Sequence, residues 1–210
     1  MFYFGSSPWI IRKVTCTENK VYLTFDDGPN PEVTPKVLDA LQKSGAFASF
    51  FVIGEKASAY PELIARMIEE GHSVHSHSAD HRYDIYFRRK DTLKDWIAAS
   101  LTALGALTGL RHRSFRPPAG VVTPPMVQVA RALNVPLVLW NHRFFDTALT
   151  WTTKKAVSNA AILKPGDIVL LHDDQKSLRA DLFVETLSIY IAEIQKRGFS
   201  LRPLGETGLV

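Results

Sequence analysis

Short apolar runs alternate along the chain with stretches whose apolar residues recur at helical spacing. The apolar runs are rich in β-branched and aromatic residues and predict strands; they lie at 20–25, 47–54, 72–77, 114–120, 135–140, 167–172 and 199–204. The helical spacing predicts helices at 34–45, 60–71, 91–109, 124–134, 153–166 and 182–198. Because alternating strands and helices favour a parallel sheet covered by helices, we predict an α/β fold. A compact or incomplete barrel is the first expectation, and an open doubly wound sheet is the alternative.

The length and composition fit one globular domain. The chain has 210 residues, of which 46% are hydrophobic, and this is enough for a sizeable core. We predict that residues 1–19 form an N-terminal segment packed on a single domain at 20–210. The net charge is +4, with dispersed basic residues. This is weak evidence for nucleic acid, so we expect no nucleic-acid partner.

Cysteine content and hydropathy narrow the class of protein further. Cys16 is the single cysteine, which excludes an internal disulfide. No apolar run approaches the length that crosses a bilayer, so we predict no transmembrane segment. The N-terminus lacks a basic leader followed by the apolar stretch of a secretory signal, and the sequence alone therefore predicts a cytoplasmic protein. Nothing in it indicates an oligomeric state.

Ionisable side chains follow nearly every predicted strand. Ligands of α/β folds bind at the carboxyl ends of the strands, and strands that only build a core do not need charged residues there. The residues at or just beyond these ends are Asp26, Asp27, His75, His77, His81, Arg116, Trp140, Asp146 and His172. Their joint occurrence predicts a single polar site at one edge of the sheet.

Two histidines in this set have the spacing of metal ligands. His77 and His81 are four residues apart, so a helical turn after the strand would point both imidazoles the same way. One added carboxylate gives a two-histidine, one-carboxylate set that leaves positions for water and substrate. Chance is the alternative, because four histidines fall within residues 72–81. Asp26-Asp27 likewise has a plain alternative as a strand-to-helix turn with an aspartate cap.

The two adjacent aspartates suggest a division of labour. A divalent cation held by Asp27, His77 and His81 would leave Asp26 free to act as a base towards water. Arg116 would keep Asp26 ionised. His172 would act as a general acid, oriented by a carboxylate such as Asp146. A metal site, a base and an acid together are typical of the active site of a hydrolase. No serine or cysteine nucleophile motif is visible.

Read together, the motifs resemble the polysaccharide deacetylases of the NodB-homology type, carbohydrate esterase family four. The resemblance covers residues 20 to about 204 in order. Its motifs are "TFDDGP" at 24–29, "GHSVHSHSADH" at 71–81, "RPPAG" at 116–120, Asp146 six residues after Trp140, and "LLH" at 170–172.

The resemblance implies roles, a fold and a cofactor. It implies Asp26 as base, Asp27, His77 and His81 as metal ligands, His172 as acid tuned by Asp146, Arg116 as the partner of Asp26, and Leu170 in the acetyl pocket. The implied fold is a distorted or incomplete (β/α) barrel of about seven parallel strands with helices outside. The implied metal is most simply Zn²⁺, with Co²⁺ or Ni²⁺ as alternatives. Most members of the family remove N-acetyl groups from amino-sugar polymers, and some remove O-acetyl groups from xylan.

The chain departs from the family pattern where the substrate would lie. Ala119 stands where an aromatic is usual, although its backbone N–H can still help to stabilise an oxyanion. Thr147 replaces a tryptophan, and Trp151 is the candidate to compensate. Trp140 is the other aromatic expected at the substrate. Arg143 occupies a position that is often acidic or small.

The sequence therefore predicts metal-dependent deacetylation of an N-acetylated saccharide, with an acetylated glycan as the partner. The first alternative is a related amidase that acts on a small or cyclic amide. The second is a non-catalytic carbohydrate-binding relative, against which the intact Asp26 and His172 argue. A glycan substrate of this kind lies in the cell envelope, whereas the missing export signal predicts a cytoplasmic protein. The two expectations conflict.

Overall fold

The computed structural model describes residues 7–112, 114–144, 146–147 and 151–205. Its centre is a parallel sheet whose strands are β2 (Lys20–Asp26), β3 (Ala48–Val52), β4 (Ser73–Ser76), β6 (His142–Arg143) and β7 (Ile168–His172), in the order β4-β3-β2-β7-β6. A further short strand, β8 (Ser200–Leu201), pairs with the start of β2. Every pairing among these strands is parallel. The predicted α/β class is confirmed.

The sheet curves into an incomplete barrel. Phe115 bridges Ser76 of β4 to Leu137 of β5 (Leu137–Val138), and β5 pairs with β1 (Ile10–Ile11). Among the described residues no ladder joins β5 to β6. The N-terminal segment spans that gap at one end, because Lys13 forms an antiparallel bridge to Asp167. The barrel therefore closes through a short segment rather than a full strand.

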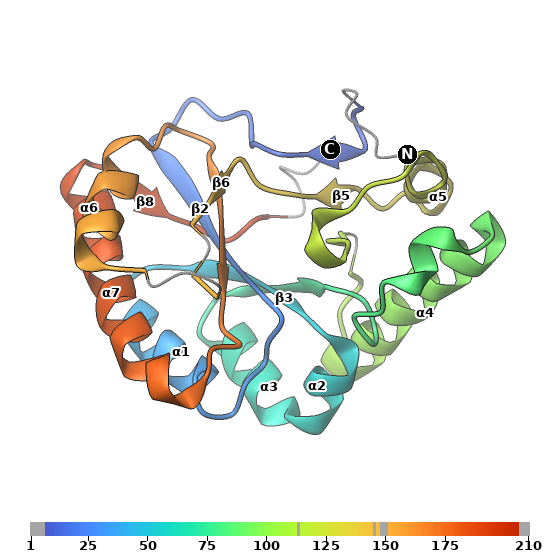
Figure 1. The fold of residues 1–210 in the computed structure, drawn as a ribbon, viewed down its shortest axis with the longest axis horizontal. Helices are drawn as coiled ribbons and strands as arrows, with labels where there is room; N and C mark the ends of the chain where they lie inside the picture. The colour runs from blue at the N-terminus through green and yellow to red at the C-terminus, as the bar shows by residue number, and fades with distance from the viewer. Residues whose placement is uncertain (1–6, 113, 145, 148–150, 206–210) are drawn as a thin grey trace.

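Helices cover the outside of the sheet along three sides in Figure 1. The α-helices are α1 (Thr34–Lys43), α2 (Gly54–Ala59), α3 (Pro61–Glu69), α4 (Lys90–Thr108), α5 (Pro124–Leu133), α6 (Thr153–Ala161) and α7 (Ser177–Lys196). Two 3₁₀ turns, η1 (Asp84–Phe87) and η2 (Pro118–Gly120), lie in the connecting loops. In the described part of the chain no helix has the length and hydropathy needed to cross a bilayer.

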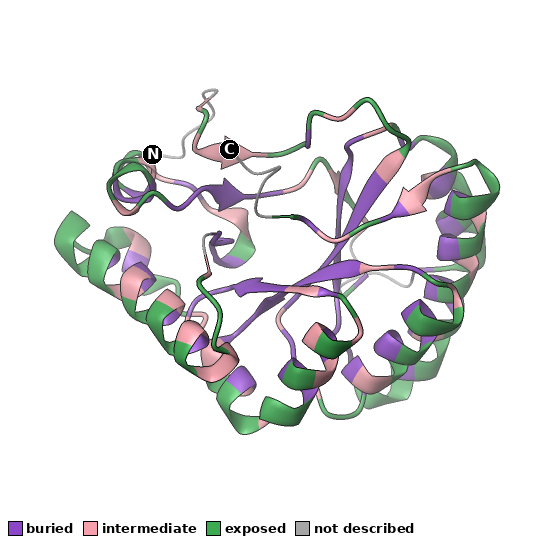
Figure 2. Ribbon diagram, turned by 180° about the vertical axis from the view of Figure 1, so that it is seen from behind, coloured by how far each residue is buried: buried purple, intermediate pink, exposed green. Residues whose placement is uncertain are grey.

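The hydrophobic core lies between the strands and the helices. Strands β2, β3, β4, β5 and β7 are almost wholly buried, β1 and β6 are not, and each helix buries only its inner face (Figure 2). Along β2 the alternate residues Val21, Leu23 and Phe25 belong to the core cluster that faces the helices. Because side chains alternate across a strand, Thr24 and Asp26 point to the other face, into the barrel. The alternation of side chains along β2 therefore places the Asp26 side chain in the barrel interior.

Several predicted element boundaries were wrong. The strand expected at 47–54 ends at Val52, and helix α2 follows at once. This helix is short and buries only Ala57, so no apolar period marks it. The strand expected at 114–120 is reduced to the bridge at Phe115 and the turn η2. The helix expected from 182 begins at Ser177, where the fully exposed Leu178 hides the apolar period.

The N-terminal residues that the structure describes contact the barrel. Trp9 and Ile10 pack against the second core cluster, and Val14 is buried. Residues 1–6 lie outside the described residues. The division of the chain into an N-terminal segment and one domain stays a prediction.

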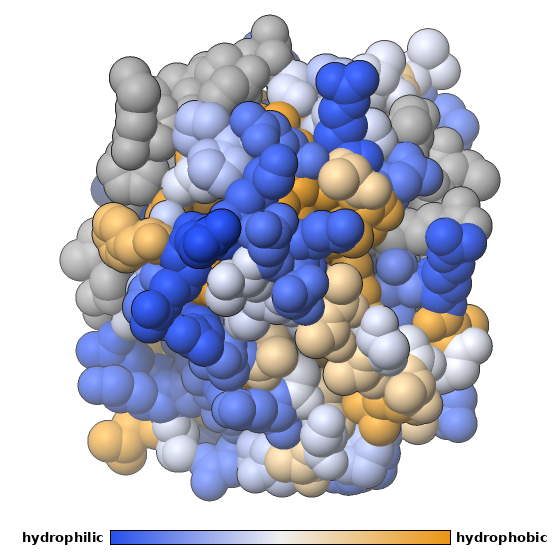
Figure 3. Space-filling view, turned by 90° about the vertical axis from the view of Figure 1, so that its right-hand side faces the viewer, coloured by the Kyte–Doolittle hydropathy of each residue, from blue (hydrophilic) through white to orange (hydrophobic). Residues whose placement is uncertain are grey.

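The face of the molecule that carries α4 and α5 is largely hydrophilic. Its hydrophobic side chains form scattered small groups (Figure 3). Such a surface is typical of a solvated protein face.

Candidate metal and catalytic site

Most of the predicted site residues meet in a pocket at the carboxyl ends of the strands. Asp26 ends β2, His77 follows β4 and His172 ends β7. The pocket measures about 190 Å³ and is lined by Asp26, Asp27, His77, His81, Tyr83, Ala119, Trp140, Arg143, Thr147, Leu170 and His172. Its volume is below the roughly 300–1,000 Å³ of common ligand pockets. It can therefore hold only the reacting end of a large substrate.

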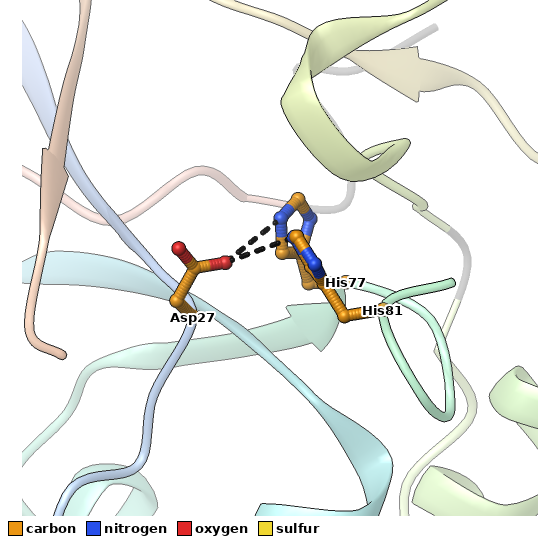
Figure 4. Close-up of side chains that lie close together, drawn as sticks. All are labelled: Asp27, His77 and His81. Atoms are coloured by element: carbon orange, nitrogen blue, oxygen red, sulfur yellow. Dashed lines mark ion pairs between the residues drawn. The ribbon is translucent and has the colours of Figure 1, made fainter. Parts of the chain in front are cut away.

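Asp27, His77 and His81 form one cluster of ligand atoms. Asp27 Oδ1 lies 3.4 Å from His77 Nε2 and 3.1 Å from His81 Nε2, and the oxygen points at both rings (Figure 4). The three atoms lie within 4.8 Å of one another. Asp27 Oδ1 is buried and accepts no hydrogen bond among the described residues. A buried oxygen without a donor, facing two ring nitrogens, fits a divalent cation with nitrogen and oxygen ligands.

The loop geometry that joins the two histidines differs from the predicted helical turn. No helix forms between His77 and His81, and Ser78 and His81 adopt left-handed backbone conformations, with φ of 76° and 52°. The Ser78 hydroxyl accepts a hydrogen bond from the His81 N–H at 2.9 Å. This turn brings the two ring centroids to 5.0 Å. Non-glycine residues rarely adopt such conformations, which are found preferentially at functional sites.

The orientation of His77 is set by the backbone. Its Nδ1 donates a hydrogen bond to the Arg116 carbonyl oxygen at 2.8 Å, which leaves Nε2 with its lone pair facing Asp27. Such a partner behind a histidine fixes the tautomer of a metal ligand. Burial raises the pKa of Asp27, but His77 and His81 beside it outweigh this and hold the pKa well below its usual range. Asp27 is therefore a carboxylate at all physiological pH values.

Asp26 is paired with a fully buried arginine. Arg116 Nη1 donates to Asp26 Oδ1 at 2.6 Å, and Arg116 is 0% exposed. The guanidinium also donates to Thr24 Oγ1 at 2.8 Å and to the carbonyl oxygens of Val138 and Leu139 at 2.9 and 3.1 Å. Burial lowers the pKa of Arg116, but arginine remains charged in proteins. The pair holds the Asp26 carboxyl group in place, with a cation against its Oδ1.

His172 is oriented by Asp146. Its Nδ1 donates to Asp146 Oδ1 at 2.9 Å, and its backbone N–H donates to Oδ2 at 2.8 Å. Gln175 donates to the same Oδ2 at 3.1 Å. Burial lowers the pKa of His172, but the Asp146 carboxylate more than offsets this, so the pKa is raised above its ordinary value. Because Nδ1 is engaged, Nε2 is the atom left to give a proton to a substrate.

A second layer of hydrogen bonds supports the loop that carries the two aspartates. Lys56 of α2 donates to the Asp27 carbonyl oxygen and to Asp174 Oδ2, both at 2.8 Å. Asn30 donates to Asp174 Oδ1 at 2.8 Å. These contacts join the loop after β2 to the loop after β7. Lys56 carries no motif signal, so these contacts were not predicted from the sequence.

Asp173 anchors the same two loops from inside. It is buried, accepts a hydrogen bond from Thr34 Oγ1 at 2.5 Å, and packs so closely on Gly28 that a Cβ there would lie 2.3 Å from its carboxylate. Burial raises the pKa of Asp173 to about 7. Gly28 is therefore needed for the close approach of the two loops.

Three of the four predicted substrate-binding residues line the pocket. Ala119 adopts a left-handed φ of 53°, and Trp140 lies against Gly120, whose Cβ would meet the Trp140 ring at 2.5 Å. Leu170 is buried in β7 behind the pocket. These positions agree with the expectation, although their contact with a substrate stays a prediction.

The prediction for Trp151 was wrong. Its side chain is only 4% exposed and does not line the pocket. It stacks on Phe144 at 6.2 Å and packs against Phe183 and Tyr190 in the main core. Core packing, rather than compensation for Thr147, explains this tryptophan.

Tyr83, Arg143 and Thr147 also line the pocket, and they form its rim with Ala119. All three are exposed. The positions of Arg143 and Thr147 were singled out as departures from the family pattern, whereas Tyr83 was missed. An exposed residue leaves no hydrophobic period in a sequence, and only the proximity of Tyr83 to His81 could have indicated it.

The sequence of the chain is similar to those of known proteins. Residues 13–138 match the family model for polysaccharide deacetylase. The chain is 36% identical to a chitooligosaccharide deacetylase of Bradyrhizobium sp. (strain ANU 289), over 88% of each chain. It is 30% identical to the peptidoglycan-N-acetylmuramic acid deacetylase PdaA of Bacillus subtilis (strain 168), over 98% of this chain and 74% of that protein.

A solved structure shows the same fold. The Bc1960 peptidoglycan N-acetylglucosamine deacetylase superposes with a TM-score of 0.84 at 26% identity, covering 93% of this chain and 91% of that one. The family match spans more than half of the chain, and the sequence relatives cover most of it. The chain belongs to the polysaccharide deacetylase family.

Proposed function

We propose that the protein is a metal-dependent hydrolase that removes acetyl groups from an N-acetylated amino-sugar glycan. One observation carries this proposal. The cluster of Asp27, His77 and His81 shares a small pocket with a carboxylate paired to Arg116 and an imidazole paired to Asp146. Binding alone requires neither a poised base nor a poised acid.

Asp27, His77 and His81 would hold the metal. Their two nitrogens and one oxygen suit Zn²⁺, and Co²⁺ or Ni²⁺ accept the same set. When bound, such an ion acts as a Lewis acid on the acetyl carbonyl and makes a water molecule more acidic. His77 is held for this role by the Arg116 carbonyl oxygen.

Asp26 would serve as the base. Its Oδ1 is engaged by Arg116, and its Oδ2 lies 3.7 Å from His77 Nε2, on the side of the ligand cluster. A carboxylate held there can take a proton from the water that attacks the carbonyl carbon. Arg116 holds the Asp26 side chain in position for that transfer.

His172 would serve as the acid. It pairs in register with Asp26 on the neighbouring strand, so the two side chains reach the same pocket from adjacent backbones. As the C–N bond breaks, Nε2 gives its proton to the departing amine nitrogen, and acetate and a free amino sugar are the products. The Ala119 backbone N–H can support the carbonyl oxygen.

The substrate class is supported by the names of the relatives. These proteins are described as deacetylases of chitooligosaccharides and of both peptidoglycan sugars. The small pocket suits an acetamido group, with the rest of the sugar outside. Such a substrate would lie at the cell envelope, and the compartment of the protein stays a prediction.

Acetate release coupled to metal analysis tests the proposal. We expect acetate from chitooligosaccharides or peptidoglycan fragments, loss of turnover after chelation, and recovery with Zn²⁺. Cleavage of a small cyclic amide while every glycan stays acetylated would favour the amidase alternative. Glycan binding without any hydrolysis would favour the non-catalytic one.

A further inference from the structure

His77 and His81 are held towards the proposed metal in different ways. The ring of His77 is held directly, because its Nδ1 donates to the Arg116 carbonyl oxygen. His81 donates from its backbone N–H to the Ser78 hydroxyl at 2.9 Å, and this contact fixes the loop rather than the ring. The direction of the His81 ring therefore depends on the conformation of the loop 77–81.

The first half of this loop is tied to helix α2. The backbone N–H groups of the first two residues of α2 donate to the carbonyl oxygens of Ser78 and Ala79, both at 2.9 Å. The second half contains Asp80 and His81, and His81 has a left-handed φ of 52°. Such a backbone costs free energy for a residue with a side chain, and it persists only where surrounding contacts enforce it.

Asp80, the residue before His81, makes a contact that can enforce this conformation. Its Oδ1 accepts a hydrogen bond from the Trp96 indole Nε1–H at 3.0 Å. Both side chains are half-buried, and a carboxylate accepts a stronger hydrogen bond than a neutral oxygen does. Trp96 lies in α4, so the bond ties the second half of the loop to a long helix.

Trp96 is itself fixed by the core. Its ring packs edge-on against Phe115, with 5.6 Å between the ring centroids, and Phe115 is fully buried. Phe115 bridges β4 to β5 and directly precedes Arg116, whose carbonyl oxygen holds His77. The supports of both histidine ligands therefore meet at the same short segment of the barrel wall.

We propose that the hydrogen bond between Trp96 and Asp80 positions His81 as a metal ligand. The inference rests on the proposed function, because it takes Asp27, His77 and His81 as the ligands. Trp96 and Asp80 are positioning residues, since both lie outside the set that lines the pocket. By thermodynamic linkage, a bond that strengthens metal binding is itself strengthened when the metal binds.

The metal affinity of three variants tests the proposal. Titration with Zn²⁺ against a competing chelator gives the dissociation constant. Trp96→Phe keeps a ring against Phe115 but removes the donor, and it should weaken Zn²⁺ binding by about tenfold. Asp80→Ala removes the acceptor and should do the same. Asp80→Asn keeps an oxygen that can accept the indole N–H, so its affinity should stay within about threefold of that of the parent protein.

A double variant and a control separate this bond from general packing. When Trp96→Phe and Asp80→Ala are combined, the loss should remain about tenfold, because both substitutions remove the same bond. Trp9→Phe is the matched control, since Trp9 packs against the same core cluster as Trp96 and lies outside the pocket. It should leave the Zn²⁺ affinity unchanged. Circular dichroism checks that each variant is folded.

The indole hydrogen of Trp96 gives a second readout that requires neither turnover nor a variant. In ¹⁵N-labelled parent protein, Zn²⁺ should slow the exchange of this hydrogen with D₂O by about tenfold, which is the reciprocal of the effect of the bond on Zn²⁺ affinity. The indole hydrogen of Trp9 should exchange at an unchanged rate. The NMR spectra of Trp96→Phe and Trp9→Phe assign the two signals.

Each outcome decides the proposal. Unchanged Zn²⁺ affinity in Trp96→Phe, or an equal loss in Trp9→Phe, overturns it while the proposed metal site stands. Equal losses in Asp80→Asn and Asp80→Ala also overturn it, because the charge of Asp80 would then act rather than the bond. Additive losses in the double variant, or an exchange rate of the Trp96 indole hydrogen that Zn²⁺ does not change, overturn it as well. A parent protein that binds no divalent metal removes the proposed function and this inference together.

Discussion

The inner wall and the rim of the pocket follow different physical rules. The inner residues Asp26, Arg116, His77 and Asp146 are 3%, 0%, 2% and 4% exposed, and each is hydrogen-bonded to another part of the barrel. On the rim, Tyr83 is 53% exposed, and Ala119 and Arg143 are also exposed. The proposed catalytic groups are therefore buried and fixed, whereas the rim that would meet the substrate is open to water.

The difference has an energetic cause. A buried charge without its partner costs several kcal/mol, so each inner residue constrains its neighbours. An exposed side chain is solvated whether or not it has a partner, and its replacement costs little. We therefore expect large, reaction-specific effects from changes to the inner wall, and small, substrate-specific effects from changes to the rim.

The largest effect is expected for His77→Ala. The variant should lose both bound metal and turnover, because two ligands hold a divalent ion far more weakly than three. It should keep the fold, since the residue lies at the barrel mouth. Elemental analysis, acetate release and circular dichroism measure the three properties. His112→Ala is the control, because His112 contacts the Val74 carbonyl oxygen outside the pocket; stoichiometric metal in His77→Ala would contradict the ligand assignment.

Asp26→Asn should separate metal binding from catalysis. The amide keeps an oxygen for Arg116 but cannot take a proton, so kcat should fall by about 10³-fold while metal content and KM change little. Steady-state kinetics on a metal-loaded preparation measures this. Near-normal rates would remove Asp26 from the role of base. Loss of metal would instead indicate that Asp26 shares in ligation.

The third effect concerns pH and follows from the raised pKa of His172. A general acid must be protonated, so activity is lost as the pH rises through its pKa. Asp146→Asn removes the carboxylate that raises this pKa, and the alkaline limb of kcat/KM should therefore move to lower pH. At pH 8 we expect a loss of about 10²-fold. Asp181 is an exposed acid on α7, and Asp181→Asn should leave the alkaline limb of kcat/KM in place. If Asp146→Asn also leaves this limb in place, the pairing of His172 with Asp146 does not set the pKa of the general acid.

The inner wall could be predicted from the sequence because its residues occupy fixed positions at strand ends. Asp26 and His172 are the last residues of β2 and β7, and the alternation of a strand settles which face each one takes. Arg116 follows the bridge at Phe115 in the same way. Motif spacing and strand period both point to these positions.

The rim and the supporting loops could not be predicted because no period governs them. Trp151 lies near the motif aspartate in sequence, yet it packs into the core beside Phe144. Lys56 reaches Asp27 from a helix that has no apolar pattern. The turn that aligns His77 with His81 depends on left-handed residues, which sequence spacing alone does not reveal. Tertiary contacts decided each of these cases.

An intermediate effect is expected between the two regions, at Lys56. This residue lies outside the pocket but donates to the backbone of a ligand. Lys56→Met should weaken metal affinity by about tenfold, as is usual when a partner behind the ligands is lost. Titration with a competing chelator measures it. Lys36→Met is the control, because it removes a similar lysine–aspartate pair, Lys36 with Asp181, that lies away from the site. An equal loss of metal affinity in both variants would show that the hydrogen bond from Lys56 to Asp27 has no specific role in metal binding.

The smallest effect is expected on the rim itself, at Tyr83. Its ring packs edge-on against His81 at 5.2 Å and is otherwise open to water, so it can offer an apolar face to a sugar that extends beyond the pocket. Tyr83→Ala should raise KM for glycan polymers by about threefold and leave kcat and metal content unchanged, whereas Tyr83→Phe should behave as the parent protein. Kinetics on polymers of increasing length measure the difference. A fall in kcat or in metal content would show that Tyr83 supports His81. Tyr83 would then belong with the residues of the inner wall rather than with the rim.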